Sequence, residues 1–533
     1  MDLVKRSQAR LDRECGSVVI DRAAPVRIAL AFPNEYRLGM ASLGYQLVYA
    51  MLNSLPKASC ERVFLPDPKE LAEHERTGTE LFTLESQSPL SEFDVVAFSI
   101  SYELDYLNAL RMLRLASIPP LTCDRDETRP LLIAGGPCPT FNPEPLADFV
   151  DAFVIGDAEP VLGSLVDVLA ANQGNSRKDT RAALAELPSV YVPGLGGAQR
   201  AVARDLSIYP GSSVISTPEA EFGEIELVEI MRGCGRGCRF CVAGHITRPP
   251  RPRAISSPLE KRGLEGGEGR RIGLVGAAVF DHPGANAICQ SILNAGREFT
   301  VSSVRLETIT TERARLLAKG GQKTLTIAPE AGSYRLRKVI NKPATDEQIS
   351  TAIAAASEAA ISRVKLYFML GLPTETDDDA IAIVDLLGRL SGEFPDVELH
   401  ASVSCFVPKP WTPFQWHPME SEAVLKRRLS VLTRGVKGIR NVELTGESPR
   451  QATIQGLLAR GDRAVGKVLM AALENGVDYR AAIRETGLDI RFYLYRKRDV
   501  SEPLPWDHID IGIDKSRLWS DYLSALQPPT RNT

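Results

Sequence analysis

A short cysteine-rich stretch constrains the fold of this chain more than any other feature. Residues 231–245 are MRGCGRGCRFCVAGH, in which Cys234, Cys238 and Cys241 have a C-x3-C-x2-C spacing. Glycines separate the cysteines, and the conformational freedom of glycine lets so short a loop turn three thiols toward one small object. Because thiolates are common metal ligands, we interpret the stretch as a metal centre.

The number of cysteines indicates which kind of centre it is. Iron–sulfur clusters normally take four thiolates, and this motif supplies three. One iron would then have no protein ligand, and an open coordination position is typical of a metal site that does chemistry. With His245, a Cys3His zinc site is an alternative, although its first spacings are too tight for common zinc fingers. A disulfide with one spare thiol is a weaker alternative, since nothing else indicates secretion.

Composition limits the class of protein. A chain of 533 residues predicts two or three domains. The net charge of -4 argues against a protein that coats nucleic acid. The sequence has no signal-peptide pattern and no run of about 18 apolar residues, so we expect a cytoplasmic protein without a membrane partner. The remaining cysteines occur singly, as reduced thiols do, at Cys15, Cys60, Cys123, Cys138, Cys289 and Cys405.

Apolar runs alternate with helical patterns in residues 1–170, which predicts a Rossmann-like α/β domain with a parallel sheet. A helical pattern covers Leu43–Leu55. The predicted strands are Val26–Phe32, Val95–Ser101, Leu131–Ala134 and Phe153–Gly156. Such sheets bind ligands beyond the carboxyl ends of their strands. Polar or glycine-rich segments follow the predicted strands at these ends. They are compatible with a ligand site, but the same residue types are also common in ordinary turns.

Residues 171–215 have the composition of a connector. A second series of apolar runs and helical patterns occupies residues 216–424, and the cysteine stretch directly follows its first strand, where parallel α/β barrels place their chemistry. The six predicted strands are Ile225–Ile230, Arg271–Val275, Val301–Leu306, Thr324–Ala328, Arg363–Leu370 and His400–Val407. We predict helices after the caps Thr345 and Thr376, and a mostly helical C-terminal region over residues 425–533, at Leu425–Leu432, Ala464–Glu474 and Ser516–Leu526.

The cysteine spacing, with Phe240 before the last cysteine, resembles the signature of the radical S-adenosylmethionine (SAM) superfamily. Longer segments resemble an uncharacterised group in that superfamily that has an N-terminal cobalamin-binding-type domain, and the resemblance covers nearly the whole chain. These segments include PNEYRLGMASLGYQLVYAMLN, LESQSPLSEFDVVAFSISYELDY, AGGPCPTFNPEPLADFVDAFVIGDAEP and PEAGSYRLRKVINK.

The resemblance implies a partial (β/α)6 barrel and a 4Fe-4S cluster on Cys234, Cys238 and Cys241. SAM would chelate the open iron, and an electron from a donor such as flavodoxin or ferredoxin would cleave it to a 5'-deoxyadenosyl radical. The residues implied to contact SAM are Phe240, Gly276, Ala277, Glu330, Gly332, Ser333 and Gly371. A salt bridge from Glu330 to Arg335 or Arg337 is an alternative role for that carboxylate. Gly266–Glu268 matches the superfamily's GGE motif, but it precedes the strand and indicates a connector.

The resemblance also implies cobalamin in the first domain. The residues implied to lie near it are Ser99, Ser101, Gly135, Gly136, Gly156 and Glu159. The chain departs from other cobalamin modules because it lacks their D-x-H-x-x-G signature, and His74 is the only histidine in residues 1–170. Two outcomes stay open: cobalt bound without a histidine from the expected place, or a domain that has lost the cofactor.

These features favour an enzyme that methylates an unactivated carbon with the help of cobalamin. A methylthiotransferase-like reaction, or another radical modification without cobalamin, is the second hypothesis. The third is a zinc-bound RNA-binding protein that uses a basic patch, although arginines also offset the negative charge of a cluster and of SAM. These arginines are Arg232, Arg236, Arg239, Arg248, Arg251 and Arg253. The sequence leaves the substrate open among small molecules, peptides and RNA.

Overall fold

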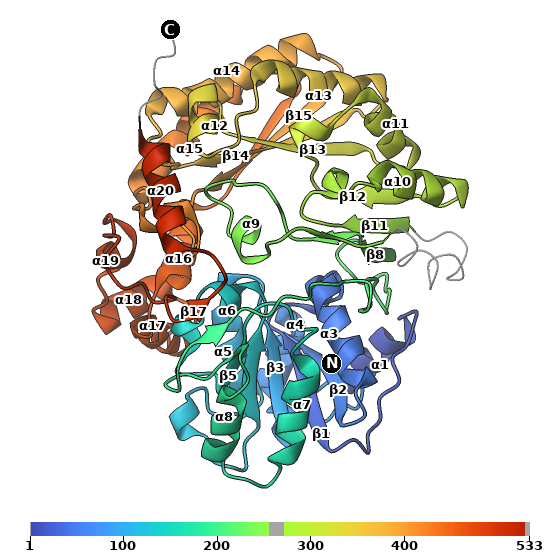
Figure 1. Ribbon diagram of the computed structural model, residues 1–533, viewed down its shortest axis with the longest axis vertical. Helices are drawn as coiled ribbons and strands as arrows, with labels where there is room; N and C mark the ends of the chain where they lie inside the picture. The colour runs from blue at the N-terminus through green and yellow to red at the C-terminus, as the bar shows by residue number, and fades with distance from the viewer. Residues whose placement is uncertain (1, 255–270, 528–533) are drawn as a thin grey trace. The chain divides into compact units, whose positions relative to one another are not determined.

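The computed structural model describes residues 2–254 and 271–527 (Figure 1). The chain forms two compact units. The first comprises residues 1–226, 458–490 and 503–512, and the second comprises residues 227–457, 491–502 and 513–533. Gly266–Glu268, the predicted connector, lies outside the described residues. None of the helices in the described ranges combines the length and the apolar character needed to cross a bilayer.

The first unit is built on a six-stranded sheet with the order β2-β1-β3-β4-β5-β6. Strands β1 to β5 are parallel, and β6 pairs antiparallel with β5. The strands are β1 Val26–Phe32, β2 Ala58–Phe64, β3 Val95–Ser99, β4 Leu131–Gly135, β5 Ala152–Val154 and β6 Val190–Tyr191. The predicted Rossmann-like sheet is therefore confirmed, and residues 171–215 add its antiparallel edge strand.

The helices of the first unit alternate with the strands, as right-handed parallel connections require. They are α1 Leu3–Asp12, α2 Tyr36–Met40, α3 Leu43–Ser54, α4 Pro68–Thr77, α5 Tyr106–Leu115, α6 Pro137–Phe141, α7 Leu162–Ala171 and α8 Arg177–Ala185. Two later helices, α17 Ala464–Glu474 and α18 Tyr479–Thr486, belong to the same unit, and β17 Ile509–Asp510 pairs with β7 Ala198–Gln199.

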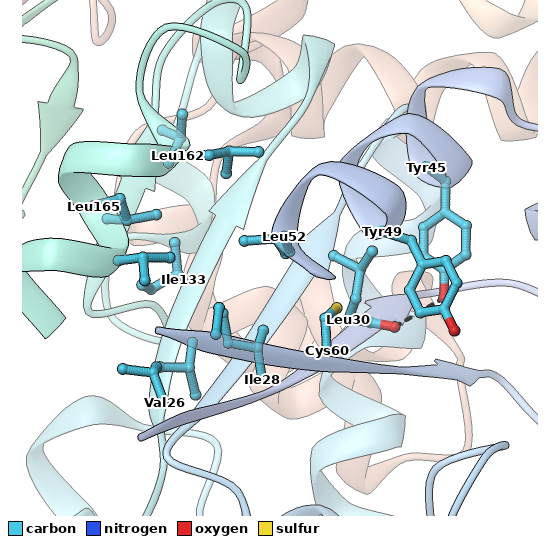
Figure 2. Close-up of a cluster of buried hydrophobic side chains, with 14 of the residues drawn as sticks. Val26, Ile28, Leu30, Tyr45, Tyr49, Leu52, Cys60, Ile133, Leu162 and Leu165 are labelled. Atoms are coloured by element: carbon cyan, nitrogen blue, oxygen red, sulfur yellow. Dashed lines mark hydrogen bonds between the residues drawn. The ribbon is translucent and has the colours of Figure 1, made fainter. Parts of the chain in front are cut away.

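One core of this unit fills the space between the sheet and helices α3 and α7 (Figure 2). Ile28 and Leu30 of β1 are each 2% exposed, and Leu52 of α3 and Leu165 of α7 belong to the same cluster. The hydroxyl of Tyr45 donates a hydrogen bond of 2.9 Å to the carbonyl of Leu30. A continuous apolar strand is buried on both faces in such a sheet, which is why the sequence pattern found β1.

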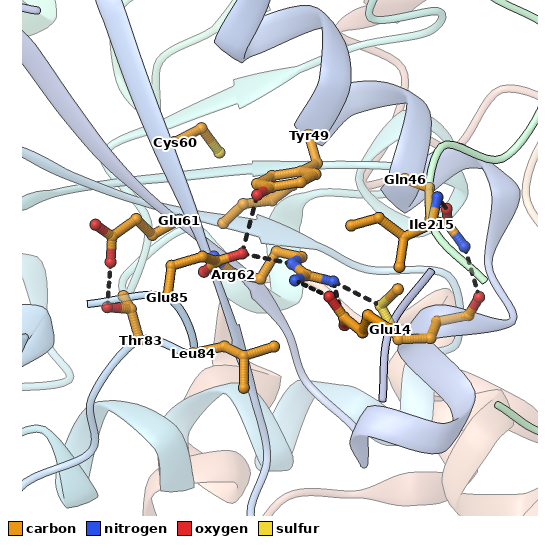
Figure 3. Close-up of polar contacts among 12 residues, drawn as sticks. Glu14, Gln46, Tyr49, Cys60, Glu61, Arg62, Thr83, Leu84, Glu85 and Ile215 are labelled. Atoms are coloured by element: carbon orange, nitrogen blue, oxygen red, sulfur yellow. Dashed lines mark hydrogen bonds and ion pairs between the residues drawn. The ribbon is translucent and has the colours of Figure 1, made fainter. Parts of the chain in front are cut away.

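The sequence analysis did not predict strand β2, because its charged residues interrupt the apolar pattern of a buried strand. All of its residues are buried. Arg62 lies 2.7 Å from Glu14 and 2.6 Å from Glu85, while Glu61 accepts a hydrogen bond of 2.6 Å from Thr83 (Figure 3). Buried charges persist only where they are paired, and these partners lie far away in the sequence.

The second unit contains two sheets with the orders β8-β11-β12 and β13-β14-β15-β16. Strands β11 and β12 are parallel, and so are all four strands of the second sheet. The backbone N–H of Val304 donates to the carbonyl of Thr326 at 2.9 Å, which joins the segment after β12 to β13. The strands are β8 Ile225–Glu229, β11 Arg271–Val275, β12 Phe299–Val301, β13 Thr324–Glu330, β14 Arg363–Leu370, β15 Glu398–Cys405 and β16 Val442–Gly446. Strands and helices alternate in an open arrangement, which confirms the predicted α/β class.

Two strands differ from the prediction. Strand β12 ends at Val301, where the predicted strand began, because the apolar residues beyond it follow an irregular path. Strand β16 was not predicted, since its sequence VELTG has no buried residue and therefore no apolar pattern. The helices of this unit are α9 Ala243–Ile246, α10 Ala285–Asn294, α11 Thr311–Lys319, α12 Tyr334–Val339, α13 Asp346–Glu358, α14 Asp377–Glu393, α15 Glu422–Val436, α16 Pro449–Arg460, α19 Ile490–Leu494 and α20 Lys515–Leu526.

Candidate metal centre and cofactor sites

The three cysteines lie on one loop whose two ends are tied together. Strand β9 Met231–Arg232 enters the loop, and β10 Arg251–Pro252 leaves it and pairs antiparallel with β9. Between them, Gly233 has a φ of +82°, and a Cβ atom there would lie 2.3 Å from the carbonyl oxygen of Thr247. Only glycine allows this approach, so the loop closes directly before the first cysteine.

The thiols are half-buried and receive backbone hydrogen bonds. The N–H of Arg236 donates to Cys234 Sγ at 3.4 Å, and the N–H of Gly244 donates to Cys241 Sγ at 3.4 Å. Burial raises the pKa of Cys241, the Gly244 N–H lowers it, and the charges of the other two cysteines raise it. The neighbouring cysteines therefore oppose ionisation of Cys241, and a bound metal would offset that effect.

Groups from two segments later in the sequence hold this loop. The carbonyl of Gly237 accepts a hydrogen bond of 2.8 Å from the side chain of Asn341, and the N–H of Arg239 donates to the carbonyl of Ile340 at 3.0 Å. The guanidinium of Arg239 also reaches Asp521 of α20 at 2.8 Å. The loop is therefore fixed on both sides of Cys238 by two segments that are remote in sequence.

Two cations beside the cysteines were missed by the sequence prediction. Burial raises the pKa of Cys238, while Lys342 and Arg305 lower it. Lys342 Nζ lies 2.7 Å from Glu330 Oε1, so Lys342 pairs with the carboxylate at the end of β13. Burial raises the pKa of Glu330 and Lys342 opposes that effect. A signal was present for Lys342, because it directly follows Asn341 in the segment that resembles the family.

The alternative role for Glu330, a salt bridge with Arg335 or Arg337, is not found in the structure. Arg335 pairs with Asp379. Arg337 is fully buried and donates to the carbonyls of Ala331 and Gly332 at 2.9 and 2.7 Å. Arg337 therefore holds the turn after β13, and Arg335 reaches the start of α14. Glu330, with a φ of +70° at an irregularity in the pairing of β13, pairs with Lys342.

The other residues implied to contact SAM fall into two groups. Phe240 and Gly276 are half-buried and Ala277 is exposed, so their surfaces are accessible. The second group, Gly332, Ser333 and Gly371, makes contacts within the protein itself. A Cβ on Gly332 would lie 2.3 Å from the backbone nitrogen of Ile383, Ser333 caps α12, and the N–H of Gly371 donates to Glu375.

The arginines of the cysteine loop are paired within the protein. Arg232 and Arg253 both contact Glu229, at 2.8 and 2.7 Å, and Arg236 contacts Asp281 at 2.9 Å. The guanidiniums of Arg248 and Arg251 donate to backbone carbonyls of the loop itself, and that of Arg239 pairs with Asp521. This pairing disfavours a basic surface that waits for RNA.

The zinc alternative also lacks support. The ring of His245 is 3% exposed, and its Nδ1 lies 2.8 Å from the carbonyl oxygen of Cys241. In the two described ranges, no three Cys, His, Asp or Glu side chains are gathered closely enough to hold one metal ion. Thiolates of an iron–sulfur cluster each bind a different iron and need no such close packing.

In the first unit, the predicted cobalamin residues lie at the carboxyl ends of the parallel strands. Ser99 and Glu159 are half-buried and Ser101 is exposed. The glycines there permit close packing of the chain on itself. Gly135 accepts a hydrogen bond from Ile100, and Cβ atoms on Gly136 and Gly156 would lie 2.6 and 2.3 Å from the carbonyl oxygens of Ile100 and Ala201.

A polar group that the sequence prediction missed lies at the ends of β1 and β3. Asp105 is buried and accepts a hydrogen bond of 2.9 Å from the side chain of Asn34. Burial raises the pKa of Asp105 to about 6. The buried hydroxyl of Tyr479 has no hydrogen-bond partner among the described residues, and the charge of Asp105 acts on it. Asn34 lies in one of the segments that resemble the family, PNEYRLGMASLGYQLVYAMLN. Tyr479 comes close to Asp105 only when the chain folds.

Comparisons with known proteins identify the family of the chain. Residues 44–193 match the family described as radical SAM proteins, N-terminal, and residues 228–387 match the radical SAM superfamily. The uncharacterized protein MJ0966 of Methanocaldococcus jannaschii is 29% identical over 450 residues, which are 83% of this chain and 90% of that protein.

Two solved enzymes have a similar fold. TsrM from Kitasatospora setae, a radical SAM methyltransferase solved with cobalamin and a 4Fe-4S cluster, superposes with a TM-score of 0.51 and 15% identity over 76% of this chain and 75% of that chain. OxsB, a cobalamin-dependent radical SAM enzyme solved with aqua-cobalamin and SAM, gives 0.52 and 14% identity over 95% and 80%.

The first family match covers strands β2 to β6 of the first unit's sheet, and the second covers the cysteine loop and strands β11 to β14. Together with the fold likeness, they confirm the resemblance seen in the sequence. The chain belongs to the radical SAM superfamily, whose enzymes use a 4Fe-4S cluster and SAM.

Proposed function

We propose that this radical SAM enzyme uses cobalamin to methylate an unactivated carbon of its substrate. The observation that carries the proposal is the strand order β2-β1-β3-β4-β5, all parallel, in the first unit. This is the flavodoxin-like order, in which the direction of chain progression reverses between β1 and β3, and ligands bind outside the carboxyl ends at that point. Asn34 and Asp105 lie there, 2.9 Å apart.

The donor set at the cysteine loop fits an iron–sulfur cluster. Cys234, Cys238 and Cys241 supply three soft ligands, backbone N–H groups reach two of the sulfurs, and Lys342 and Arg305 offset negative charge beside the third. Bound by these three cysteines, a cluster would supply the electron that cleaves SAM. The loop's own contribution is to hold three thiolates and to leave one ligand position for SAM.

The proposed SAM residues have separate tasks. Glu330 and Lys342 form a buried ion pair beside Cys238, and a zwitterionic amino acid group is recognised by such paired opposite charges. Gly276 and Ala277 follow β11, where backbone groups stay available at a strand end. Phe240, between the second and third cysteines, offers an apolar surface.

The first unit offers polar groups for the corrin side chains of cobalamin but no histidine for cobalt at the described strand ends. The corrin ring carries amide side chains, which need both donors and acceptors. The Asp105 carboxylate accepts, the unpartnered Tyr479 hydroxyl donates, and Ser99 and Ser101 lie on the neighbouring strand end. No histidine follows β1 to β5 at the described strand ends, so the protein would bind the cofactor by these contacts without a histidine on cobalt.

The experiment is an absorption spectrum of the protein purified without oxygen from cobalamin-fed cells. We expect a bound corrin together with the broad absorption of an iron–sulfur cluster. With reductant, a flavodoxin or ferredoxin and SAM labelled in its methyl group, 5'-deoxyadenosine and label transfer to a cellular fraction should follow. A protein that cleaves SAM but binds no corrin would overturn the cobalamin step and favour a radical modification without it.

A methylthiotransferase usually needs a second cluster. The other six cysteines are spread over both units, and Cys60, Cys138, Cys289 and Cys405 are separately buried, so the described residues offer no second triad. Iron and sulfide analysis of the same preparation separates this alternative, because it would require about eight irons for each chain rather than about four.

A further inference from the structure

Two helices of the second unit flank the cysteine loop. Arg239, which directly follows Cys238, pairs with Asp521 of α20 at 2.8 Å. Its guanidinium also donates to the carbonyls of Lys338 and Val339, at the end of α12, at 3.2 and 2.7 Å. Helices α12 and α20 contact each other and lie on the same side of the unit (Figure 1). The surface that they expose therefore lies beside the proposed cluster ligands.

This surface, which we call the α12–α20 face, is formed by exposed side chains of both helices. Spacings of three and four residues put the members of each helix on one side of it. The residues of the face are Tyr334 and Lys338 of α12, and Arg517, Ser520 and Leu523 of α20.

The α12–α20 face has an excess of positive charge. Helix α12 contains no carboxylate, and the only one in α20 is Asp521, which Arg239 already neutralises. Lys338 and Arg517 are exposed and form no ion pair in the part of the chain that the structure describes. The whole chain has a net charge of -4, so this excess is a local feature. Carboxylates of a partner would complement these two cations and speed its encounter with the face.

Apolar side chains accompany the cations. Tyr334 is 46% exposed and Leu523 is 41% exposed, and the ammonium of Lys338 lies 5.7 Å from the centre of the Tyr334 ring. Aromatic side chains within a charged rim are typical of protein interfaces. Two unpaired cations are few for a nucleic acid, whose binding depends on many phosphate contacts. The mixture of charge and apolar surface therefore favours a protein partner.

We propose that the α12–α20 face docks a small acidic electron carrier of the flavodoxin or ferredoxin type. Its carboxylates would lie against Lys338 and Arg517, and its apolar side chains against Tyr334 and Leu523. The reduced carrier would give one electron to the cluster, and no proton or chemical group would be transferred at this face. Interfaces of electron carriers are small and transient, so a few side chains are enough. The docking rests on the proposed cluster and not on cobalamin or methyl transfer.

Calorimetric titration of the reconstituted full-length protein with a flavodoxin at low salt tests the docking directly. The double variant Lys338→Gln with Arg517→Glu should raise the Kd about tenfold, because it removes one favourable charge and reverses another. Lys338→Gln keeps the backbone carbonyl that Arg239 uses. NaCl at about 0.5 M should weaken wild-type binding and reduce the difference between the proteins, because salt screens exposed charges.

Arg315→Glu is the matched control. Arg315 is an exposed arginine in the middle of α11, which packs on α10 and α13 elsewhere in the same unit (Figure 1), and its reversal should leave the Kd unchanged. Leu523→Ser should raise the Kd about fivefold at low and high salt alike, because it removes apolar contact rather than charge. Equal Kd values for the double variant and Arg315→Glu would contradict the face. Failure of the wild-type protein to bind either a flavodoxin or a ferredoxin would contradict it as well.

A single-stranded RNA oligomer probes the other class of partner in the same titration. We expect it to bind more weakly than the flavodoxin, because the face offers few cations. Tighter binding of the oligomer that is lost in the double variant would overturn the choice of a protein.

SAM cleavage separates the docking from the reaction. With a flavodoxin at low concentration, its reductase and NADPH, the double variant should form 5'-deoxyadenosine about tenfold more slowly than the wild type. With dithionite, a small reductant that needs no docking face, the two proteins should react at the same rate. An equal loss with both reductants would assign Lys338 and Arg517 to support of the cluster and overturn the docking. If the wild type cleaves no SAM with dithionite, the proposed reaction fails, while the Kd values still decide the docking.

Discussion

Arg239 Nε lies 2.8 Å from Asp521 Oδ1, although 282 positions separate the two residues in the sequence. The contact joins the cysteine loop to the last helix, α20. That helix packs through aromatic side chains, because Trp519 meets Trp416 edge-on at 5.1 Å and Tyr522 lies 3.2 Å from His417. The end of the chain is thus part of the support for the proposed cluster.

Asp521→Asn should weaken retention of the cluster more than it weakens the fold. The ion pair is partly exposed, so its loss changes the free energy of unfolding by about 1 kcal/mol or less. The loop would lose one of its anchors, and iron should leave the reconstituted protein faster in the presence of a chelator. Asp167→Asn removes an exposed pair of similar length with Lys57 in the first unit, and iron release from this control should match the wild type.

Cys238→Ala should abolish both the cluster absorption and SAM cleavage. Two cysteines cannot hold the cluster with a single open iron, so iron and sulfide should fall to background after anaerobic reconstitution. Cys289→Ala is the control, since that thiol is buried in α10 away from the loop, and it should keep both properties. A Cys238→Ala protein with wild-type iron content would refute the ligand assignment.

Lys342→Met should destabilise the protein, because it leaves Glu330 buried without its cation. Removal of one partner of a buried ion pair costs about 3 kcal/mol, and protonation of Glu330 limits the cost. The double variant Lys342→Met with Glu330→Gln should recover most of the loss, since it removes the unpaired charge as well. Urea unfolding of the four proteins without SAM measures this coupling, and additive losses would show that the pair has no energetic link.

The raised pKa of Asp105 should make the stability of the protein depend on pH. This pKa is about 6 in the folded protein, against an ordinary value of 3.8, because burial disfavours the charge of Asp105. A raised pKa means that the folded state binds the proton more tightly, so this contribution is full below pH 4 and is lost as the pH rises through 6. The loss should be about 3 kcal/mol at most.

The measurement compares wild-type protein with Asp105→Asn by urea unfolding from pH 4 to pH 8. Other titrating groups are common to both proteins, so the difference isolates Asp105. We expect the variant to gain stability relative to the wild type as the pH rises. A difference that stays constant over this range would show that Asp105 keeps an ordinary pKa.

The sequence alone determined the class of fold and the place of the metal loop. Strands such as Val26–Phe32 are apolar throughout, and helices such as Asp346–Glu358 begin at a capping threonine, so their signals are local. The three cysteines lie within eight residues, and their local spacing is enough to predict them as cluster ligands. Features that depend on residues close together in the sequence can be predicted without knowledge of the fold.

Only the tertiary structure decided which charges meet. Strand β2 could not be predicted from the sequence, because its buried Arg62 pairs with Glu14 and Glu85, which come from two other segments of the chain. Lys342 pairs with Glu330, and neither of the arginines considered as alternative partners does. The charge of Asp105 acts on Tyr479, which comes from a helix far along the chain. Electrostatic pairing depends on distance in space and on burial, neither of which a linear pattern contains.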